Sequence, residues 1–505
     1  MSRTFTQSPV PATPGLDALD AVTVAAGSAP DGVQAVGYTV AASGDVPAAL
    51  GLDREALSRA GFEGKPGSVL ALPSASGPGV FAVGVGDDAP TGAALRDAAA
   101  AFVRAASRWA DVALVVADVG GLDAVETGRV LAEGVALGRY RYAVLQSDSK
   151  HVPLERVTFD VAGFEGTAGA DGGRLADGIA AGLRDARATV VARDLANTPP
   201  GRLTATDFGT VAQELGARFG FDVELFDKAA LEGLGCGGLL GVNQGSAEEP
   251  RMIKLSYTPH GEATGHLGLV GKGIMYDSGG ISLKPSDPMH LLMKMDMGGA
   301  AAVLGAFTAL RDAGATARVT GWLMCTDNMP SGSSYKLGDV LVARGGTTIE
   351  VKNTDAEGRL VMCDALVLAT EDGVDAIVDI ATLTGAALMS LGQARAPFFA
   401  TDEALADAVS AAAESADEPV WRFPLERKYR SQLDSGIADI ANLGGKYAGA
   451  TTAALFLEHF VGETPWAHLD IAGTMQSDSD DSWRSKGATG YGARILLHTA
   501  ATFSR

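Results

Sequence analysis

The stretch "NTDAEGRL", residues 353–360, places Asp355, Glu357 and Arg359 on alternate positions directly before an apolar segment. The apolar positions from Leu360 to Thr370 recur at helical spacing, which predicts a helix with one buried face. Asp355 could cap this helix, and Glu357 would lie in its first turn, where the helix dipole favours negative charge. From these eight residues alone, a capped helix start and a functional cluster of charges are equally good interpretations.

The composition is that of a globular protein with more than one domain. The chain has 505 residues, too many for one ordinary core, and 47% of them are hydrophobic and 20% charged. The formal net charge of -21, spread along the sequence, argues against nucleic acid and anionic membranes as partners. The three cysteines lie far apart, and we see no signal peptide and no apolar run that could span a bilayer. We therefore expect a cytoplasmic protein.

The order of the predicted elements indicates two α/β domains. Residues 1–16 are rich in Pro, Ser and Thr and predict a flexible tail. Apolar runs alternate with Ala-rich helical stretches over residues 17–165, which predicts a smaller domain with a mainly parallel sheet. Residues 166–200 are interpreted as a linker helix that ends at "NTPPG". Residues 201–505 form the larger domain, with strands expected in "HLGLVGKGI", "ARVTGWLMCTD", "GVDAIVDIATLTGA" and "PWAHLDIAGT".

Further charged residues flank the predicted strands and helices of the larger domain. Lys272, Asp277 and Lys284 fall on loops expected at the carboxyl end of the strand "LGLV", where open α/β sheets bind ligands. Asp296 precedes an apolar helix, as the acids of the opening stretch do. Four crowded carboxylates would raise one another's pKa values, and two divalent cations about 4 Å apart would supply the compensating charge. Taken singly, the two lysines fit plain surface lysines at least as well.

Longer motifs around these residues resemble one known family. The motifs are "RDLANTPPGRLT", "GKGIMYDSGGISLKP", "MKMDMGGAAAV", "NTDAEGRLVMCDAL", "IATLTGA" and "PWAHLDIAGT". Over residues 190–500 the chain is similar to the dimetal leucyl aminopeptidases, also called cytosol aminopeptidases. The resemblance implies a macro-like N-terminal domain and a catalytic domain with a central mixed sheet flanked by helices. It also implies homo-hexamers with interior active sites that admit small peptides.

The same resemblance implies a role for each charged residue. Lys284 would polarise the scissile carbonyl, and Arg359 would hold a bicarbonate ion that acts as the general base. The bicarbonate would take a proton from the water that bridges the two metals, which leaves the attacking hydroxide. The substrate's N-terminal amine would bind the more exchangeable metal, so one residue is released at a time. Two divalent ions, Mn²⁺ or Zn²⁺ with Mg²⁺ or Co²⁺ as alternatives, would be held by Lys272, Asp277, Asp296, Asp355 and Glu357.

The resemblance also implies an adaptable side-chain pocket. The matching positions are Met293, Thr382, Leu383, Gly385, Ala472 and Met475. Because methionine is flexible, Leu-like and Met-like residues should be preferred with modest discrimination. These positions fit ordinary core packing nearly as well. The chain departs from the family at Met275-Tyr276, where Thr-Phe is usual, and at Gly298, where Ser is frequent.

Two other functions are compatible with these residues. Another dinuclear hydrolase, such as a phosphatase, could use a similar carboxylate cluster. Alternatively, the protein could bind ADP-ribose or nucleic acid and have incidental peptidase activity. The glycines of "GPGVFAVGVGDD" are a weak signal for a nucleotide, because turns use the same residues. We favour a metal-dependent aminopeptidase that acts in intracellular peptide turnover.

Overall fold

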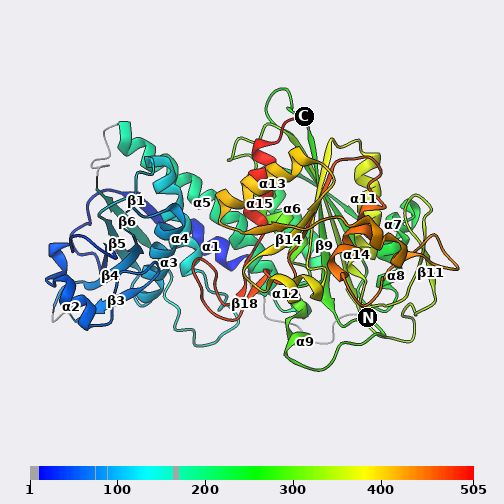
Figure 1. The fold of residues 1–505 in the computed structure, drawn as a ribbon, viewed down its shortest axis with the longest axis horizontal. Helices are drawn as coiled ribbons and strands as arrows, with labels where there is room; N and C mark the ends of the chain where they lie inside the picture. The colour runs from blue at the N-terminus through cyan, green and yellow to red at the C-terminus, as the bar shows by residue number, and fades with distance from the viewer. Residues whose placement is uncertain (1–10, 74–75, 88, 163–169) are drawn as a thin grey trace. The chain divides into compact units, whose positions relative to one another are not determined.

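The computed structural model describes residues 11–73, 76–87, 89–162 and 170–505, which divide into two compact units (Figure 1). The smaller unit includes Thr13–Val190 and an excursion from near the end of the chain, Asp478–Lys486. The larger unit includes Val191–Ser477 and Gly487–Arg505. Each unit has its own sheet with helices against it, so the predicted α/β class with a smaller N-terminal and a larger C-terminal part is confirmed.

The smaller unit is built on a six-stranded sheet with the order β1-β6-β5-β2-β4-β3. Neighbouring strands are parallel except β3, which pairs antiparallel with β4 at one edge. The mainly parallel sheet predicted from the sequence is therefore confirmed. The strands are β1 (Thr23–Ala26), β2 (Ala35–Ala41), β3 (Val69–Leu72), β4 (Gly79–Gly86), β5 (Asp111–Val116) and β6 (Arg156–Val161).

Side-chain caps set the start of the two central helices of this unit. Thr91 accepts a hydrogen bond from the first turn of α3, and Asp123 does the same for α4. The first helix, α1, begins within the segment that the sequence assigns to a tail, of which residues 1–10 lie outside the described residues. The helices are α1 (Pro14–Ala21), α2 (Arg54–Arg59), α3 (Gly92–Ala105), α4 (Ala124–Arg139) and the long α5 (Ala170–Asn197), whose last residues belong to the larger unit.

The larger unit is built on an eight-stranded mixed sheet with the order β15-β14-β17-β13-β9-β10-β8-β7. Strands β17, β13, β9 and β10 are parallel neighbours in its centre, and they are the four strands expected from the sequence. Because helices cover both faces, these strands are buried almost throughout. The strands are β7 (Asp222–Phe226), β8 (Arg251–Tyr257), β9 (His266–Asp277), β10 (Arg318–Asn328), β13 (Ala376–Ala381), β14 (Ala396–Ala400), β15 (Val420–Arg422) and β17 (Trp466–Asp470).

Helices α11 and α14 lie on one side of this sheet, and α13 and α15 lie on the other (Figure 1). On the first side, Val270 and Ile274 of β9 share a core with Leu360 and Leu366 of α11. On the opposite face of β9, Gly271 lies against α10. The helices are α6 (Ala205–Phe219), α7 (Lys228–Leu234), α8 (Gly237–Asn243), α9 (Pro288–Leu292), α10 (Gly298–Phe307), α11 (Gly358–Glu371), α12 (Gly385–Leu391), α13 (Glu403–Ala416), α14 (Gly449–Glu458) and α15 (Ala493–Thr502).

Two short sheets complete the larger unit. In the three-stranded sheet β11-β12-β16, β11 and β12 precede the stretch 353–360 in the chain and β16 follows it. Strand β18 precedes the excursion Asp478–Lys486 and pairs with β19, which follows it. These strands are β11 (Val340–Val342), β12 (Thr348–Glu350), β16 (Ile440–Ala441), β18 (Gln476–Ser477) and β19 (Gly487–Ala488).

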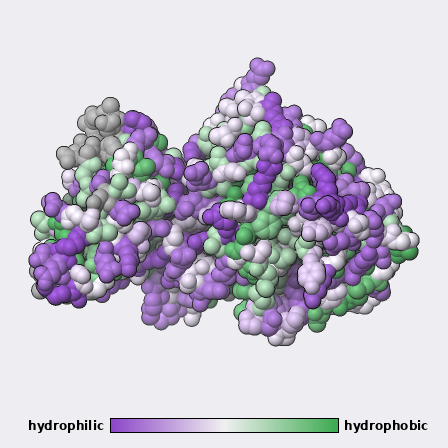
Figure 2. All heavy atoms as spheres, in the orientation of Figure 1, coloured by the Kyte–Doolittle hydropathy of each residue, from purple (hydrophilic) through white to green (hydrophobic). Residues whose placement is uncertain are grey.

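The visible surface is largely hydrophilic, with apolar atoms gathered over the region of α12 (Figure 2). Met389 of α12 is 86% exposed. Among the helices of the described residues, none is both long enough and apolar enough to cross a membrane.

Candidate metal centre and active site

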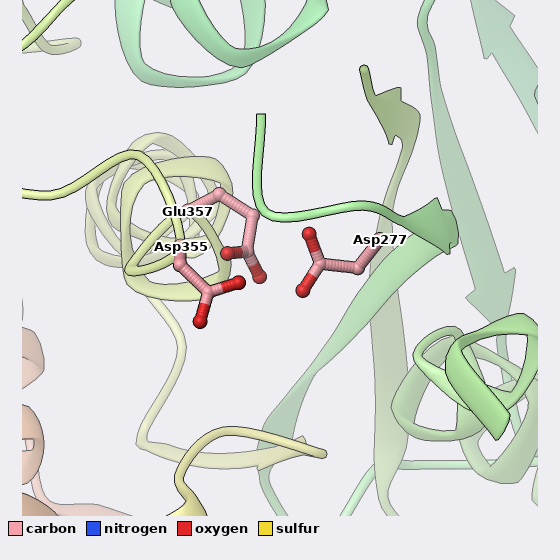
Figure 3. Close-up of side chains that lie close together, drawn as sticks. All are labelled: Asp277, Asp355 and Glu357. Atoms are coloured by element: carbon pink, nitrogen blue, oxygen red, sulfur yellow. The ribbon is translucent and has the colours of Figure 1, made fainter. Parts of the chain in front are cut away.

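Three carboxylates meet where β9 ends and α11 begins. Asp277 is the last residue of β9, and Asp355 and Glu357 lie in the turn directly before α11. Figure 3 shows the Asp277 side chain facing the other two across a short gap. One oxygen from each carboxylate lies within 4.8 Å of the others. The stretch 353–360 therefore contributes to a cluster of charges.

Lys272 lies inside β9 and Asp277 is the last residue of this strand, so the predicted place of both residues on a loop is wrong. The strand does not end after "LGLV" but continues to Asp277. Gly271 permits this course, because a Cβ at this position would lie only 2.7 Å from the Cα of Ala300 in α10. The strand thus carries both Lys272 and Asp277 rigidly, where loop residues would be freer.

Asp355 does not cap α11, so the predicted helix cap at this residue is wrong. The helix begins at Gly358 after Glu357, and the Glu357 side chain makes no capping hydrogen bond. The Asp355 carboxylate instead lies 2.5 Å from the Nζ of Lys284. Both acids of the stretch therefore direct their charge toward the cluster rather than toward the helix end.

Two lysines balance the acids. The Nζ of Lys272 lies 2.7 Å from Oδ2 of Asp296 and 2.9 Å from Oε1 of Glu357. The Nζ of Lys284 lies 2.8 Å from Oδ2 of Asp277. Burial alone would lower the pKa of both ammonium groups, but the neighbouring carboxylates outweigh it and raise each pKa above its usual value.

The pKa values of Asp277 and Asp296 are raised, first by burial and then by the charge of neighbouring acids. Burial, followed by the charge of Glu357, raises the pKa of Asp277 to about 6. Burial also raises the pKa of Asp296 to about 8, against the opposing charge of Lys272. Glu357 is the exception, because its pKa lies below the usual value. Burial alone would raise this pKa, but the charges of Lys272 and Lys284 outweigh burial and lower it. The cluster therefore carries more negative charge than its environment favours, a condition that bound cations relieve.

Arg359 lies in the first turn of α11 with free hydrogen-bond donors. Its side chain is buried, and its Nε and Nη1 have no hydrogen-bond partner among the described residues. Burial lowers the pKa of its guanidinium to about 10, and the charges of Glu357 and Asp470 oppose that shift. Because buried donors rarely stay unpaired, this site suits an anionic ligand.

A pocket of about 230 Å³ opens beside the charged cluster. All six positions predicted to contact the substrate side chain line it, together with the carboxylates and both lysines. Further apolar side chains of the stretch "DPMHLLMKM" also line the pocket and were not predicted, although the methionines of this stretch were an available signal. The pocket is lined by Met289, Leu292, Met293, Met295, Thr382, Leu383, Thr384, Gly385, Leu388, Ala472, Met475 and Gln476.

Two of the lining residues, Thr382 and Met475, also make contacts that position other parts of the site. The Thr382 hydroxyl donates to Oδ1 of Asp296 at 2.7 Å, and the Thr382 carbonyl accepts from Lys272 at 2.8 Å. Thr382 therefore holds two members of the cluster. A Cβ at Gly298 would lie 2.6 Å from the sulfur of Met475, so the departure from serine at this position makes room for that methionine.

The donor set fits divalent cations. Its oxygens come from converging carboxylates, and the buried Oε2 of Glu357 has no hydrogen-bond partner within the described part of the chain. Oxygen-rich sites of this kind suit hard divalent ions. A carboxylate and lysine cluster beside a pocket, at the carboxyl edge of an α/β sheet, is the arrangement of a dinuclear metallohydrolase.

Comparison with known proteins gives the family. Residues 190–497 match the catalytic domain of the cytosol aminopeptidase family, and residues 45–149 match its N-terminal domain. The chain therefore belongs to the cytosol aminopeptidase family, and it is a metal-dependent aminopeptidase, an exopeptidase among the hydrolases. The resemblance inferred from the motifs is confirmed, and it extends into the N-terminal half.

Similar proteins cover nearly the whole chain. A probable cytosol aminopeptidase of Streptomyces coelicolor is 43% identical over 467 residues, which are 88% of this chain and 89% of that protein. One from a Synechococcus species is 42% identical over 458 residues, again 88% and 89% of the two chains. The solved structure of the bottromycin maturation enzyme BotP in complex with Mn is 40% identical and has a TM-score of 0.84. That match covers 94% of this chain and 100% of BotP.

Proposed function

We propose that the protein hydrolyses the first peptide bond of short peptides and releases their N-terminal residue, with Leu-like and Met-like residues preferred. The observation that carries this proposal is that Asp277, Asp355 and Glu357 line the same pocket as the apolar side chains. A substrate side chain in the apolar part would bring the adjoining peptide bond to the charged part. Methionine-lined pockets adapt to several side-chain shapes, which supports a broad preference.

Five residues would hold two divalent metal ions per molecule. The donor set suits Mn²⁺ or Zn²⁺, with Mg²⁺ or Co²⁺ as alternatives, and the relative named as a complex with Mn supports manganese. When bound, the ions would balance the carboxylates and supply the Lewis acidity that polarises a carbonyl and activates water. The proposed ligands are Lys272, Asp277, Asp296, Asp355 and Glu357. Lys272 would bind as the free amine, because the positive charge of neighbouring metal ions lowers the pKa of an ammonium group and an ammonium cannot coordinate a metal.

Lys284 would act on the scissile carbonyl. Its ammonium lies between Asp277 and Asp355 at the edge of the cluster and lines the pocket. A compact positive charge on a flexible side chain can follow the carbonyl oxygen as negative charge develops there. The carboxylates that surround Lys284 keep it charged, so it would serve as an electrophile and not as a base.

Arg359 would hold a bicarbonate ion. Its buried Nε and Nη1 have no hydrogen-bond partner among the described residues, so the guanidinium keeps donors for an anionic ligand. Bicarbonate is able to accept a proton, so an ion held here would supply the general base that the side chains of the cluster do not provide. Burial lowers the pKa of this guanidinium to about 10, and a bound anion would oppose that shift as the charges of Glu357 and Asp470 do.

We also propose that the protein is a cytoplasmic homo-hexamer that acts in peptide turnover. The support is its family membership, and its three free, buried cysteines are compatible with a reducing compartment. Light scattering tests the assembly, and a monomer at micromolar concentration would contradict it. Binding of ADP-ribose or nucleic acid stays the alternative to this proposal, and calorimetric titration of each ligand tests it.

A narrower role is the second candidate. BotP, at 40% identity over most of the chain, is named as a maturation enzyme of bottromycin, so this fold also occurs in an enzyme named for the maturation of one compound. Values of kcat/KM for a panel of peptides that differ in the first residue separate the two roles. Broad acceptance favours turnover, and one strongly preferred peptide favours maturation.

Product analysis tests the proposed reaction directly. With divalent metal present, Leu-Gly-Gly should release free leucine, while N-acetyl-Leu-Gly-Gly should stay intact because its amine is blocked. Internal cleavage of longer peptides, or release of phosphate from p-nitrophenyl phosphate without any peptide cleavage, would contradict the proposal.

A further inference from the structure

We infer that Asn328 is a positioning residue that orients Asp277 and fixes its separation from the stretch that carries Asp355; this rests on the proposed metal site. Asn328 is the last residue of β10, and its side chain is fully buried. Its Nδ2 donates to Oδ1 of Asp277 at 2.8 Å and to the carbonyl of Thr354 at 2.9 Å. One amide group thus connects the ends of two strands with the turn before α11.

The position of the amide nitrogen follows from chemistry. Both partners of Asn328, a carboxylate and a carbonyl, accept hydrogen bonds, so only the NH₂ group can face them. Each of its two hydrogens then has one partner. The backbone is fixed as well, because the Asn328 carbonyl accepts from both the amide nitrogen and the hydroxyl of Ser278, at 3.0 Å and 2.7 Å.

An irregularity in the sheet brings Asn328 and Asp277 together. Along most of β9 and β10 the register is regular and pairs Thr326 with Ile274. The next pair is Asp327 with Tyr276, so Met275 is an extra residue of β9. The pair after that is Asn328 with Asp277. Bulges of this kind redirect side chains beside active sites, and here the bulge falls at the Met275-Tyr276 departure from the family.

The contact leaves one carboxylate oxygen of Asp277 directed into the site. Oδ1 accepts from Asn328 and from the backbone nitrogen of Gly279 at 2.9 Å. Oδ2 lies 2.8 Å from Lys284 within the cluster. With Oδ1 held on two sides, the carboxylate plane cannot rotate freely. Outer partners of this kind typically change metal affinity by about 10- to 100-fold.

Tyr335 provides a matched control. Its hydroxyl donates to the same Thr354 carbonyl at 2.8 Å, and its side chain is also fully buried. Tyr335→Phe removes this hydrogen bond without removing a contact to Asp277, whereas Asn328→Ala removes both bonds of the amide. The two variants separate the orientation of Asp277 from the anchoring of the turn.

The test is calorimetric titration of Mn²⁺ into the metal-free, full-length protein and its variants, with melting curves recorded for each. Asn328→Ala and Asn328→Ser should bind Mn²⁺ about 10- to 100-fold more weakly than the native protein. Tyr335→Phe should stay within about threefold of native affinity, as expected for a residue without a contact to the ligand set.

Each other result has a definite meaning. If a folded Asn328 variant binds Mn²⁺ with native affinity, the inference is overturned. It is also overturned if Tyr335→Phe loses as much Mn²⁺ affinity as Asn328→Ala, because the loss would then come from the turn at Thr354 and not from the orientation of Asp277. If neither Asn328 variant folds, the amide supports the fold and not the site, and the inference fails. If the native protein itself binds no Mn²⁺, the proposed metal site fails instead.

Discussion

Lys272 and Glu357 form a fully buried ion pair, with Nζ of the lysine 2.9 Å from Oε1 of the acid. The pair joins the middle of β9 to the start of α11, and Gly358 closes over it: a Cβ there would lie 2.7 Å from Cε of Lys272. Breaking a buried pair from one side leaves an uncompensated charge. The acids of this cluster therefore need nearby positive charge, from the two lysines or from bound metal ions.

Glu357→Gln should remove metal-dependent activity while the protein stays folded. The change keeps the size of the side chain but removes a charge from the centre of the cluster. We expect Mn²⁺ affinity to fall at least about a hundredfold, since even outer partners of a ligand reach that effect. Calorimetry measures it, and Glu371→Gln at the exposed end of the same helix is the control. Equal Mn²⁺ affinity in the two variants would contradict the assignment.

Lys284→Ala should separate catalysis from metal binding. Loss of an electrophile at the developing oxyanion should lower kcat by about 10²- to 10³-fold. Mn²⁺ affinity should stay the same or rise, because a competing positive charge leaves Asp277 and Asp355. Steady-state kinetics and calorimetry on one preparation check both parts. Weaker Mn²⁺ binding with unchanged kcat would reverse the proposed role.

Arg359→Ala should remove any response to bicarbonate. In buffer purged of carbon dioxide, the native protein should be activated by added bicarbonate, whereas the variant should not respond. We expect its kcat to be about a hundredfold lower, the usual minimum effect of a lost general base. Arg359→Lys should recover little, because lysine lacks the two-pronged donor geometry. A native enzyme indifferent to bicarbonate would argue against this role.

Met293→Ala should widen the pocket and change the preferred N-terminal residue. Removal of part of the apolar lining should lower kcat/KM for leucine substrates about 10- to 200-fold relative to phenylalanine substrates. The ratio of the two kcat/KM values measures this change. Met389→Ala serves as the control, since Met389 is 86% exposed and does not line the pocket. An unchanged ratio in Met293→Ala would place the substrate side chain elsewhere.

Metal binding should release protons and become tighter as the pH rises from about 5 to about 8. The pKa values of Asp277, about 6, and Asp296, about 8, mean that both acids hold protons over part of this range. Because a metal ion competes with these protons, low pH weakens binding and high pH favours it. Calorimetry in buffers of different ionisation enthalpy counts the released protons. Mn²⁺ affinity independent of pH would contradict these pKa shifts.

The sequence predicted the charged cluster because its members lie in short, distinctive stretches. Asp355, Glu357 and Arg359 occur within five positions, and Lys272 and Asp277 share one buried strand. The predicted loop positions of Lys272 and Asp277 were wrong because β9 stays paired with β10 as far as Asp277, and pairing with a strand distant in sequence is not visible in a local pattern. The cap was wrong because Asp355 has a stronger partner in Lys284, distant in sequence.

Contacts between strands that are distant in sequence could not be predicted. Asn328 reaches Asp277 only because β10 lies beside β9 and a bulge shifts their register by one residue. Likewise, no local pattern indicates that Asp478–Lys486 leaves the larger unit and joins the smaller one. Such relationships depend on the packing of the whole sheet or unit, whereas motifs and periodicity describe only neighbours along the chain.

The most direct test of the central claim is hydrolysis of leucine p-nitroanilide by protein from which metal has been removed with a chelator. Activity should be absent in the metal-free protein and should return when Mn²⁺, Zn²⁺, Mg²⁺ or Co²⁺ is added, while Glu357→Ala stays inactive with each ion. Full activity without metal, or restored activity in Glu357→Ala, would contradict the account.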